Sequence, residues 1–307
     1  MRIIDAHHHL WCPVNDTANI GYVWLKNIGA IKPFGDPTAI QRDYLADEFA
    51  TESQQHELIA SVHVQADGAI PDAVRESQWL ESVKRQHQLP TAHVGFLDFT
   101  KPTVEAELER YFALPGFRGV RQILSKLDGK PTLSFCQEHL LRHPVWRQQY
   151  GLLANKHLSF DCQLYPEQMV EAAAFFAQHP SIPVIVDHAG SPHDQSPQGL
   201  VTLKYGLRAL AKLPHCQIKL SGFGMFDSEW SAETIWPVFR LILDAFGPDR
   251  MLFGSNYPVD KLMRSYDFIV DEIVKCCRKA GLSKAETARI FADNARDFYR
   301  LTAIPAS

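Results

Sequence analysis

A regular alternation of short β-rich runs with amphipathic helical runs constrains the fold of this chain more than any other feature. The runs 58–64 and 183–187 are apolar almost throughout, as expected of strands that are buried on both faces. Strands separated by helices pair in parallel, and eight such units can close into a barrel. The predicted strands are 2–6, 58–64, 91–97, 117–122, 157–163, 183–187, 216–221 and 250–254.

Helical patterns between and after these strands complete the prediction of the fold. They lie at 71–87, 103–114, 145–155, 166–179, 200–213, 229–246, 266–280 and 284–300. We therefore predict an α/β fold, a (β/α)8 TIM barrel, that occupies residues 1–307 as a single domain. A doubly wound open sheet is the alternative, but no GxGxxG sequence follows any predicted strand.

A long insertion after the first strand, residues 12–57, interrupts the alternation. It is rich in Pro, Asn, Gly and Asp and stands in place of a simple first crossover. In a barrel this segment would lie over the C-terminal mouth, where active sites occur. Trp11, Tyr22, Trp24 and Arg42, in or next to the insertion, could line or cover a pocket, or could pack only within the loop.

The composition disfavours several classes of function. The 307 residues are 46% hydrophobic and 21% charged with a net charge of −4, so the chain is globular and has no basic signature of nucleic-acid binding. No apolar run approaches the roughly 18 residues that cross a bilayer, and no signal peptide is visible. Six cysteines without a CxxC pair are typical of reduced thiols. We expect a cytoplasmic protein that acts on a small molecule and binds neither nucleic acid nor membrane; a homo-oligomer is left open.

Two histidines at the end of the first predicted strand mark a candidate site. Alternate side chains of an extended strand share a face, so Asp5, His7 and His9 should project together. His8 should point away. Two imidazoles one pleat apart can bind a divalent metal or a substrate carbonyl. A tag remnant is disfavoured, because the histidines continue an apolar strand and precede Leu10 and Trp11.

Further polar side chains lie at the carboxyl ends of the other predicted strands, which meet at one mouth of a barrel. They are His63, Gln65, Asp98, Arg121, Asp161, Gln163, Tyr165, Asp187, His188, Lys219, Ser221 and Asn256. His188 lies where an apolar strand meets a Gly/Pro turn and could ligate a metal, polarise a carbonyl or move a proton. Arg121 could hold a carboxylate or a developing oxyanion, or could pair structurally with a strand-end carboxylate.

The eighth strand ends in an amide rather than a carboxylate. Asn256 can hydrogen-bond a substrate but cannot act as a base, and Asp260, four residues on, is the nearest carboxylate. The predicted catalytic residues are His188, Asn256, Arg121 and Asp260. The predicted substrate-binding residues are Arg121, Gln65, Gln163, Tyr165 and Trp11.

With these residues assembled, the chain resembles the amidohydrolase superfamily. More narrowly, it is similar to the amidohydrolase-related branch that contains 2-pyrone-4,6-dicarboxylate lactonase and sugar-acid lactonases. The resemblance runs nearly end to end, and its motifs are weak singly but specific in this order and spacing. They are Asp5-Ala6-His7-x-His9-x-Trp11, Val64-Gln65-Ala66, Gly95-Phe96-Leu97-Asp98, Gly119-Val120-Arg121, Phe160-Asp161, Asp187-His188-Ala189-Gly190, Lys219-Leu220-Ser221-Gly222, Phe253-Gly254-Ser255-Asn256-Tyr257-Pro258 and Asn294-Ala295.

The resemblance implies a (β/α)8 barrel and hydrolysis, most often of a lactone. In the metal-dependent relatives the histidine pair of the first strand, here His7 and His9, binds a divalent ion. An aspartate that ends the eighth strand helps to bind the ion and acts as the base. A histidine of the sixth strand, here His188, assists.

Three positions depart from the family pattern. The fourth strand offers Arg121 and no lysine, so no carbamoylated lysine can bridge two metals. Gln163 stands where many relatives place histidine, and Asn256 where the usual residue is aspartate. Neutral ligands make a poor zinc site. The sequence therefore predicts at most one divalent ion at His7 and His9, with zinc as the expected metal, or metal-independent chemistry.

The leading functional prediction is a hydrolase that opens a small carboxylated or polyhydroxylated lactone by attack of water. Two alternatives remain open at this point. One is other amidohydrolase-type chemistry, such as decarboxylation of a small unsaturated acid. The other is a non-catalytic, metabolite-binding pseudoenzyme, because the expected strand-8 carboxylate is absent at Asn256.

Overall fold

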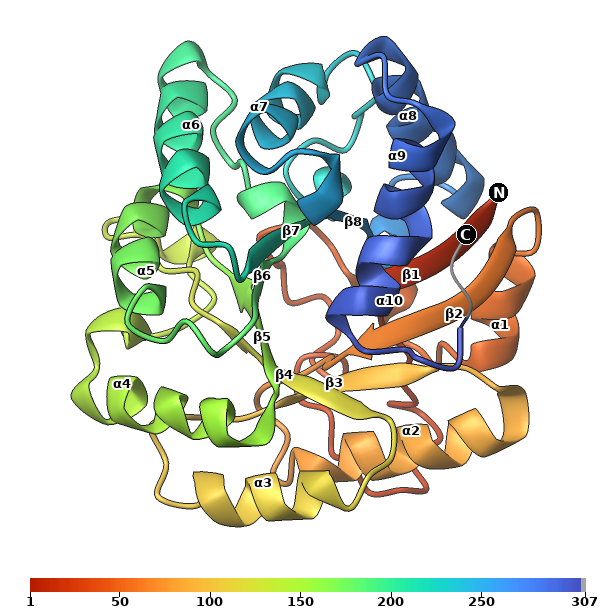
Figure 1. The fold of residues 1–307 in the computed structure, drawn as a ribbon. Coiled ribbons are helices and arrows are strands. Elements are labelled where there is room, and N and C mark those ends of the chain that lie inside the picture. Colours follow the sequence, from red (N-terminus) through yellow and green to blue (C-terminus); the bar gives the residue numbers. More distant parts are fainter. Residues whose placement is uncertain (305–307) are drawn as a thin grey trace.

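Eight parallel strands form one sheet in the order of the sequence, β1 to β8 (Figure 1). The structure, a computed structural model, describes residues 1–304, so the last three residues of the predicted domain lie outside the described part. The strands are β1 (Arg2–His8), β2 (Glu57–Val64), β3 (Ala92–Phe96), β4 (Phe117–Ile123), β5 (Ser159–Gln163), β6 (Val184–Val186), β7 (Cys216–Leu220) and β8 (Met251–Phe253). The chain after β8 joins β1, because the amide of Asn256 donates to the carbonyl of His7 at 2.7 Å and the amide of His9 to that of Tyr257 at 2.6 Å. The predicted TIM barrel is confirmed.

The helices surround the strands (Figure 1). They are α1 (Ala46–Glu52), α2 (Val74–His87), α3 (Val104–Phe112), α4 (Pro144–Tyr150), α5 (Met169–Phe176), α6 (Pro197–Ala211), α7 (Trp236–Phe246), α8 (Tyr266–Lys279), α9 (Lys284–Ala288) and α10 (Asn294–Phe298). Serine side chains cap the N-termini of α6, α8 and α9, as the local sequence favours. No helix within residues 1–304 is long and apolar enough to span a membrane.

Three predicted helices differ from the observed ones. The pattern at 145–155 is helical only to Tyr150 and continues as a tighter 3-10 turn from Gly151. The pattern at 229–246 becomes an α-helix only at Trp236, since the side chains of Ser231 and Thr234 bond nearby backbone groups and hold a turn instead. The pattern at 284–300 is divided by a π-helical segment, Arg289–Asp293, between α9 and α10.

A separate apolar cluster fills the inside of the barrel. Strand residues that face inward meet side chains from the segment around α10, which lies across one end of the barrel (Figure 1). Members of this cluster include Ile4, Ala6, Ala60, Val62, Val64, Val94, Ile185, Leu252, Ala295, Phe298, Tyr299 and Leu301. The barrel is therefore a packed core with one end closed, and the opposite end holds the pocket described below.

The pairing of β1 with β2 contains an irregularity that the sequence pattern does not predict. Asp5 pairs with Ser61 and His8 with His63, so two residues of β1 lie opposite the single residue Val62. One extra residue of this kind is a β-bulge, which changes the face to which the following side chains point.

The bulge corrects one prediction about the first strand. His7 does face the barrel interior and His9 the pocket, and His8 points outward and stacks on Phe49 of α1, as expected. Asp5, however, does not share their face. Its carboxylate accepts hydrogen bonds from the hydroxyl of Tyr266 in α8 at 3.2 Å and from the amide of Ser255 at 3.0 Å, outside the barrel.

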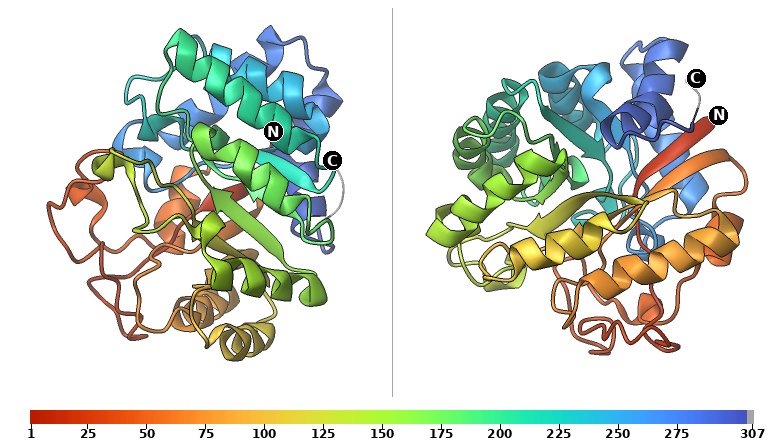
Figure 2. Two further views of the ribbon diagram at one scale, coloured as in Figure 1. Left: turned by 90° about the vertical axis from the view of Figure 1, so that its left-hand side faces the viewer. Right: turned by 60° about the horizontal axis from the view of Figure 1, so that its bottom comes forward.

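The insertion, residues 12–57, contains little regular structure but is held by side chains that bond its backbone. The Gln41 amide donates to the carbonyls of Trp24 and Asn27 at 2.8 and 2.9 Å. The Asp67 carboxylate, just beyond β2, accepts from the amides of Val23 and Trp24 at 2.6 and 3.0 Å. In the left view of Figure 2 the red and orange insertion lies on the opposite side of the molecule from the C-terminus.

Gly119 in β4 provides a test of the barrel's packing. A Cβ at this position would lie 2.1 Å from the Ser159 hydroxyl oxygen and 2.6 Å from the Ser159 carbonyl oxygen on β5, so the two strands would have to separate. We expect Gly119→Ala to lower the free energy of unfolding by about 1–3 kcal/mol. Thermal or chemical denaturation measures the change.

Gly151→Ala is the matched control. A Cβ there would find only the His179 ring at 3.8 Å, and the backbone φ of −59° suits alanine. Equal stability of the two variants would contradict the packing argument.

Candidate active site

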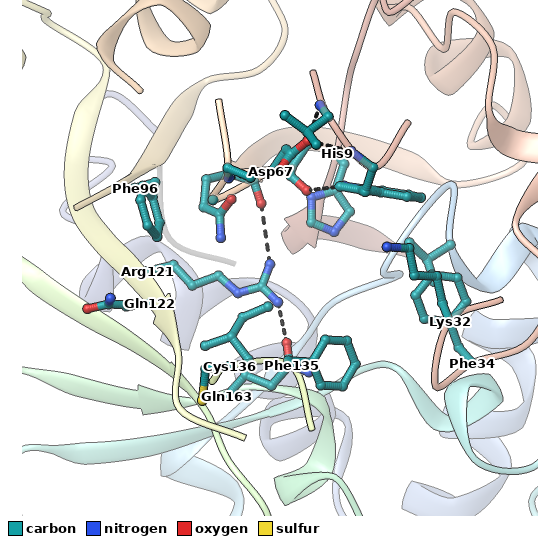
Figure 3. A pocket seen from close by; sticks show the side chains of 18 of the residues that line it. His9, Lys32, Phe34, Asp67, Phe96, Arg121, Gln122, Phe135, Cys136 and Gln163 are labelled. Carbon is teal, nitrogen blue, oxygen red and sulfur yellow. Dashed lines mark hydrogen bonds between the residues drawn. The ribbon is translucent and has the colours of Figure 1, made fainter. Parts of the chain in front are cut away.

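A cavity of about 500 Å³ lies where the carboxyl ends of the strands meet the insertion (Figure 3). Most of the predicted site residues line it: His9, Trp11, Gln65, Arg121, Gln163, His188 and Asn256. The insertion contributes Val23, Trp24, Asn27, Lys32 and Phe34, and the segment after β4 contributes Phe135, Cys136 and Leu140. The barrel thus supplies most of the polar groups of the cavity, and the connecting segments supply most of its aromatic and apolar wall.

Three of the residues predicted to be catalytic, substrate-binding or metal-ligating do not line this cavity. Tyr165 donates its hydroxyl hydrogen to the Leu133 carbonyl at 2.5 Å, and its ring packs edge-on against His193. Asp260 is buried behind Asn256, whose side-chain amide donates to it at 3.1 Å. His7 lies deeper in the barrel, among charged side chains.

Beneath the cavity, the ammonium of Lys219 is surrounded by acceptors from three other strands or strand ends. It lies 2.5 Å from the Asp161 carboxylate, 2.9 Å from the Asp187 carboxylate and 3.1 Å from Nδ1 of His7. Arg121 approaches the other oxygen of Asp187 at 3.3 Å. We call these five side chains the barrel-floor cluster; two cations balance two carboxylates in it, and all five are buried.

The environment of the barrel-floor cluster keeps Asp187 ionised. Burial raises its pKa, but the opposing effects of Lys219, His7 and Arg121 are together larger, so the pKa falls well below the ordinary value. Arg121 is held by more than this ion pair, since its Nη1 donates to the Gln65 carbonyl at 3.3 Å and its Nη2 to the side-chain oxygen of Gln163 (Figure 3). The guanidinium is therefore fixed in orientation at the cavity wall.

The histidines that face the site are neutral. Burial is the main cause that lowers the pKa values of His7 and His9 well below their usual range and that of His188 to about 3. Nδ1 of His9 lies 2.7 Å from the Val64 carbonyl, which can only accept, so Nδ1 carries the proton and Nε2 is left with a lone pair. Nε2 of His7 has no hydrogen-bond partner within the described chain.

A tight turn with left-handed backbone angles sets the position of His188. Residues 188–191 all have positive φ, with 54° at His188, and such a run is uncommon outside glycine. The hydroxyl oxygen of Ser221 accepts from the His188 amide at 3.3 Å and lies 3.1 Å from its Nδ1. Gly222 packs directly on the ring, because a Cβ there would lie 2.5 Å from Nδ1.

His7, Asp187 and His188 form a candidate site for a divalent metal. Their ligand atoms all lie within 4.8 Å of one another, and two imidazoles with one carboxylate suit such an ion. The charges around them fit less well. Both oxygens of Asp187 already face cations, and Asn256 adds no charge from β8. A divalent ion would therefore bring an unbalanced double charge into a buried cluster that is already neutral, so these residues fit a resident metal poorly.

Two charged residues of the cavity lining were not predicted by the sequence analysis. Asp67 had a usable signal, since it lies three residues beyond the end of β2 and precedes a glycine, as site residues near strand ends often do. Lys32 had none, because the surrounding Ile31-Lys32-Pro33-Phe34 stretch of the insertion has no periodicity from which a direction can be inferred.

The chain is similar in sequence and in fold to several known proteins. The chain is 36% identical over 304 residues to "Uncharacterized protein y4mH" of Sinorhizobium fredii, with 98% of this chain and 99% of the relative covered. It is 29% identical to an L-fucono-1,5-lactonase of Burkholderia multivorans, with 97% and 96% covered. A crystal structure of an amidohydrolase from Burkholderia multivorans with bound Zn has a TM-score of 0.79 at 26% identity and covers 99% of this chain and 100% of that one. The family model described as amidohydrolase matches residues 4–301, so the chain belongs to the amidohydrolase family.

Proposed function

We propose that this protein hydrolyses a small carboxylated or polyhydroxylated lactone by attack of water. One observation carries the proposal: His9, Arg121 and His188 meet at the wall of one cavity, with both imidazoles neutral and the guanidinium fixed. These are a proton acceptor, an anion binder and a hydrogen-bond donor, the three groups that ester hydrolysis needs. The similarity to L-fucono-1,5-lactonases supports a lactone as the ester.

In this proposal His188 polarises the lactone carbonyl. Its backbone amide donates to the Ser221 hydroxyl oxygen, so the hydroxyl hydrogen is free to point at Nδ1. Nδ1 then accepts, and the proton of the neutral ring sits on Nε2, which donates a hydrogen bond to the carbonyl oxygen and keeps its proton. Arg121 stabilises the negative charge that develops on this oxygen, or holds a substrate carboxylate, through the guanidinium hydrogens that Gln65 and Gln163 do not use.

His9 and Asn256 act on the attacking water. With its proton on Nδ1, His9 can only accept at Nε2, so it takes the proton that water loses as the new C–O bond forms. Asn256 directs its NH2 group to Asp260, which leaves the amide oxygen to accept a hydrogen bond from the same water. Collapse of the tetrahedral intermediate breaks the ring C–O bond, and the ring oxygen leaves as a hydroxyl with the proton that His9 took from water.

We expect this hydrolysis to proceed without a resident metal, because the charges around Asp187 are already balanced. If a zinc ion is bound, the ligands are His7, Asp187 and His188.

The first prediction concerns turnover and metal dependence. Lactone opening, followed by acid release with a pH indicator across sugar lactones and pyrone dicarboxylates, should be equally fast before and after treatment with a chelator. Arg121→Gln should lower kcat/KM by about 100-fold, the usual effect of losing one oxyanion donor. Arg118→Gln, on the same strand but outside the cavity, is the control and should retain activity.

Two results would overturn this reading. Absence of turnover across the panel, even with added zinc or manganese, would exclude the proposed hydrolysis. Activity that is lost on chelation and restored by zinc would replace the metal-independent mechanism by a metal-dependent one.

The second prediction is a pH dependence caused by Asp260. Burial raises the pKa of this carboxyl to about 7, against smaller opposing effects of the Asn256 amide and of the backbone at Gly222 and Gly224. Above this pH the carboxylate accepts from Asn256; below it the protonated carboxyl can donate to the amide oxygen and compete with water. We therefore expect kcat/KM to rise with pH through about 7. Asp260→Asn should remove this rise, and a profile unchanged in that variant would contradict the role.

The third prediction separates an enzyme from a metabolite-binding pseudoenzyme. Asn256 has a φ of 56°, a conformation that aspartate also tolerates, so Asn256→Asp should fold. A second carboxylate next to Asp260 would be repelled by it, and we expect the variant to be no more active than the natural chain at neutral pH. Hydrolysis that appears only in Asn256→Asp would favour the pseudoenzyme.

A further inference from the structure

Lys32 brings a positive charge to the cavity from the insertion. It lines the cavity together with Trp24 and Phe34, and Figure 3 shows it on the other side of the cavity from Arg121. Its ammonium lies 5.5 Å from the centre of the Trp24 ring. A lysine in such half-buried, aromatic surroundings is screened less by water than one at the open surface, so its charge acts more strongly on a bound group.

No carboxylate of residues 1–304 pairs with the Lys32 ammonium. Other lysines near the insertion do have such partners: Lys26 lies 3.2 Å from Asp16, and Lys261 pairs with Glu48 at 2.6 Å. Asp67 is the acidic residue of the cavity lining, and its carboxylate already accepts hydrogen bonds from backbone amides.

The hydrogen bonds of Asp67 show why it cannot serve Lys32. One oxygen accepts from the amides of Val23 and Trp24, and the other accepts from the amide of Ala69 at 2.8 Å. The cavity therefore contains a cation that the protein itself does not neutralise.

The backbone around Lys32 is held in place. Its amide donates to the Gly35 carbonyl and its carbonyl accepts from the Gly35 amide, both at 2.9 Å. Gly35 has a φ of 104°, which favours glycine and closes this turn. Trp24, beneath the ammonium, is fixed through its ring N–H, which donates to the Ala66 carbonyl at 2.8 Å. The charge is thus presented from a defined position.

We propose that Lys32 determines substrate specificity by binding a carboxylate on the part of the lactone remote from the reacting carbonyl. This inference rests on the proposed lactone hydrolysis and narrows its substrate class to lactones that retain a free carboxylate. Arg121 then serves the reacting carbonyl, and the two cations engage opposite ends of one substrate. A single ammonium flanked by aromatic rings matches the single charge of a carboxylate better than the double charge of a phosphate, which usually recruits several cations or backbone amides.

A matched pair of substrates tests this role: a lactone with a free carboxylate, and the methyl ester of the same compound. Lys32→Gln should raise KM for the acid by about 10-fold or more and leave kcat within about threefold, because binding is lost without a change at the reacting centre. The ester should be unaffected. Lys26→Gln, in the same insertion but outside the cavity, should change neither KM nor kcat for the acid or the ester. Equal effects of Lys32→Gln on acid and ester, or no effect on either, would overturn the proposal.

A binding measurement keeps this inference separable from the proposed reaction. Calorimetry with glucarate, which has two carboxylates, and gluconate, which has one, requires no turnover. Lys32→Gln should weaken the binding of glucarate about 10-fold and remove the part of its salt dependence that Lys32 contributes. The affinity for gluconate should not change. If this pattern appears while no lactone is opened, the hydrolysis proposal fails and the role of Lys32 stands. If lactones are opened and the variant binds both acids normally, the role of Lys32 fails.

Discussion

The buried ammonium of Lys219 is the interaction on which the rest of the structure depends. It connects Asp161 of β5 and Asp187 beyond β6 across the barrel, and Asp187 in turn holds Arg121 of β4. From below, the hydroxyl of Tyr299 donates to Asp161 at 2.7 Å, so the segment that closes the barrel is tied to the same cluster. Removing one charge from such a network leaves its partner buried and uncompensated, which is far more costly than loss of a surface pair. The floor of the cavity therefore forms as a unit.

The same charge balance determines what chemistry the site can perform. Because Asp187 is satisfied by two cations, it does not supply the negative charge that would hold a divalent ion between His7 and His188. The nearby imidazoles remain neutral for a related reason: burial and the neighbouring cations both disfavour a further positive charge. Neutral imidazoles, unlike imidazolium ions, can both accept and donate a proton. Because the charges of the barrel-floor cluster balance one another, acid–base chemistry falls to the neutral residues that line the cavity above it.

The sequence predicted the barrel well because the signals were local. Buried strands appear as apolar runs, and polar residues at their carboxyl ends, such as Arg121 and His188, must converge once the strands are parallel. The orientation of Asp5 was mispredicted, because a β-bulge depends on pairing with β2 and not on the β1 sequence itself. Tyr165 lies two residues beyond β5, where alternation no longer specifies direction, and its hydroxyl donates to the Leu133 carbonyl. The position of Lys32 in the cavity could not be predicted from the sequence, because it depends on long-range hydrogen bonds of an irregular segment.

Those long-range bonds divide the site into two parts with different tolerance to change. The reacting groups stand on strands whose positions are set by the barrel-floor cluster, so substitutions there affect folding and chemistry together. The insertion is attached to the barrel in part through Asp67 and is held internally by Gln41, and both side chains bind backbone amides or carbonyls and not particular side chains. Side chains such as Lys32 and Phe34 can therefore be exchanged while the backbone that carries them keeps its anchors. Substrate specificity can therefore change in this fold without disturbing the charges beneath the cavity. The reacting groups and the substrate-binding side chains of the insertion are held by separate sets of hydrogen bonds.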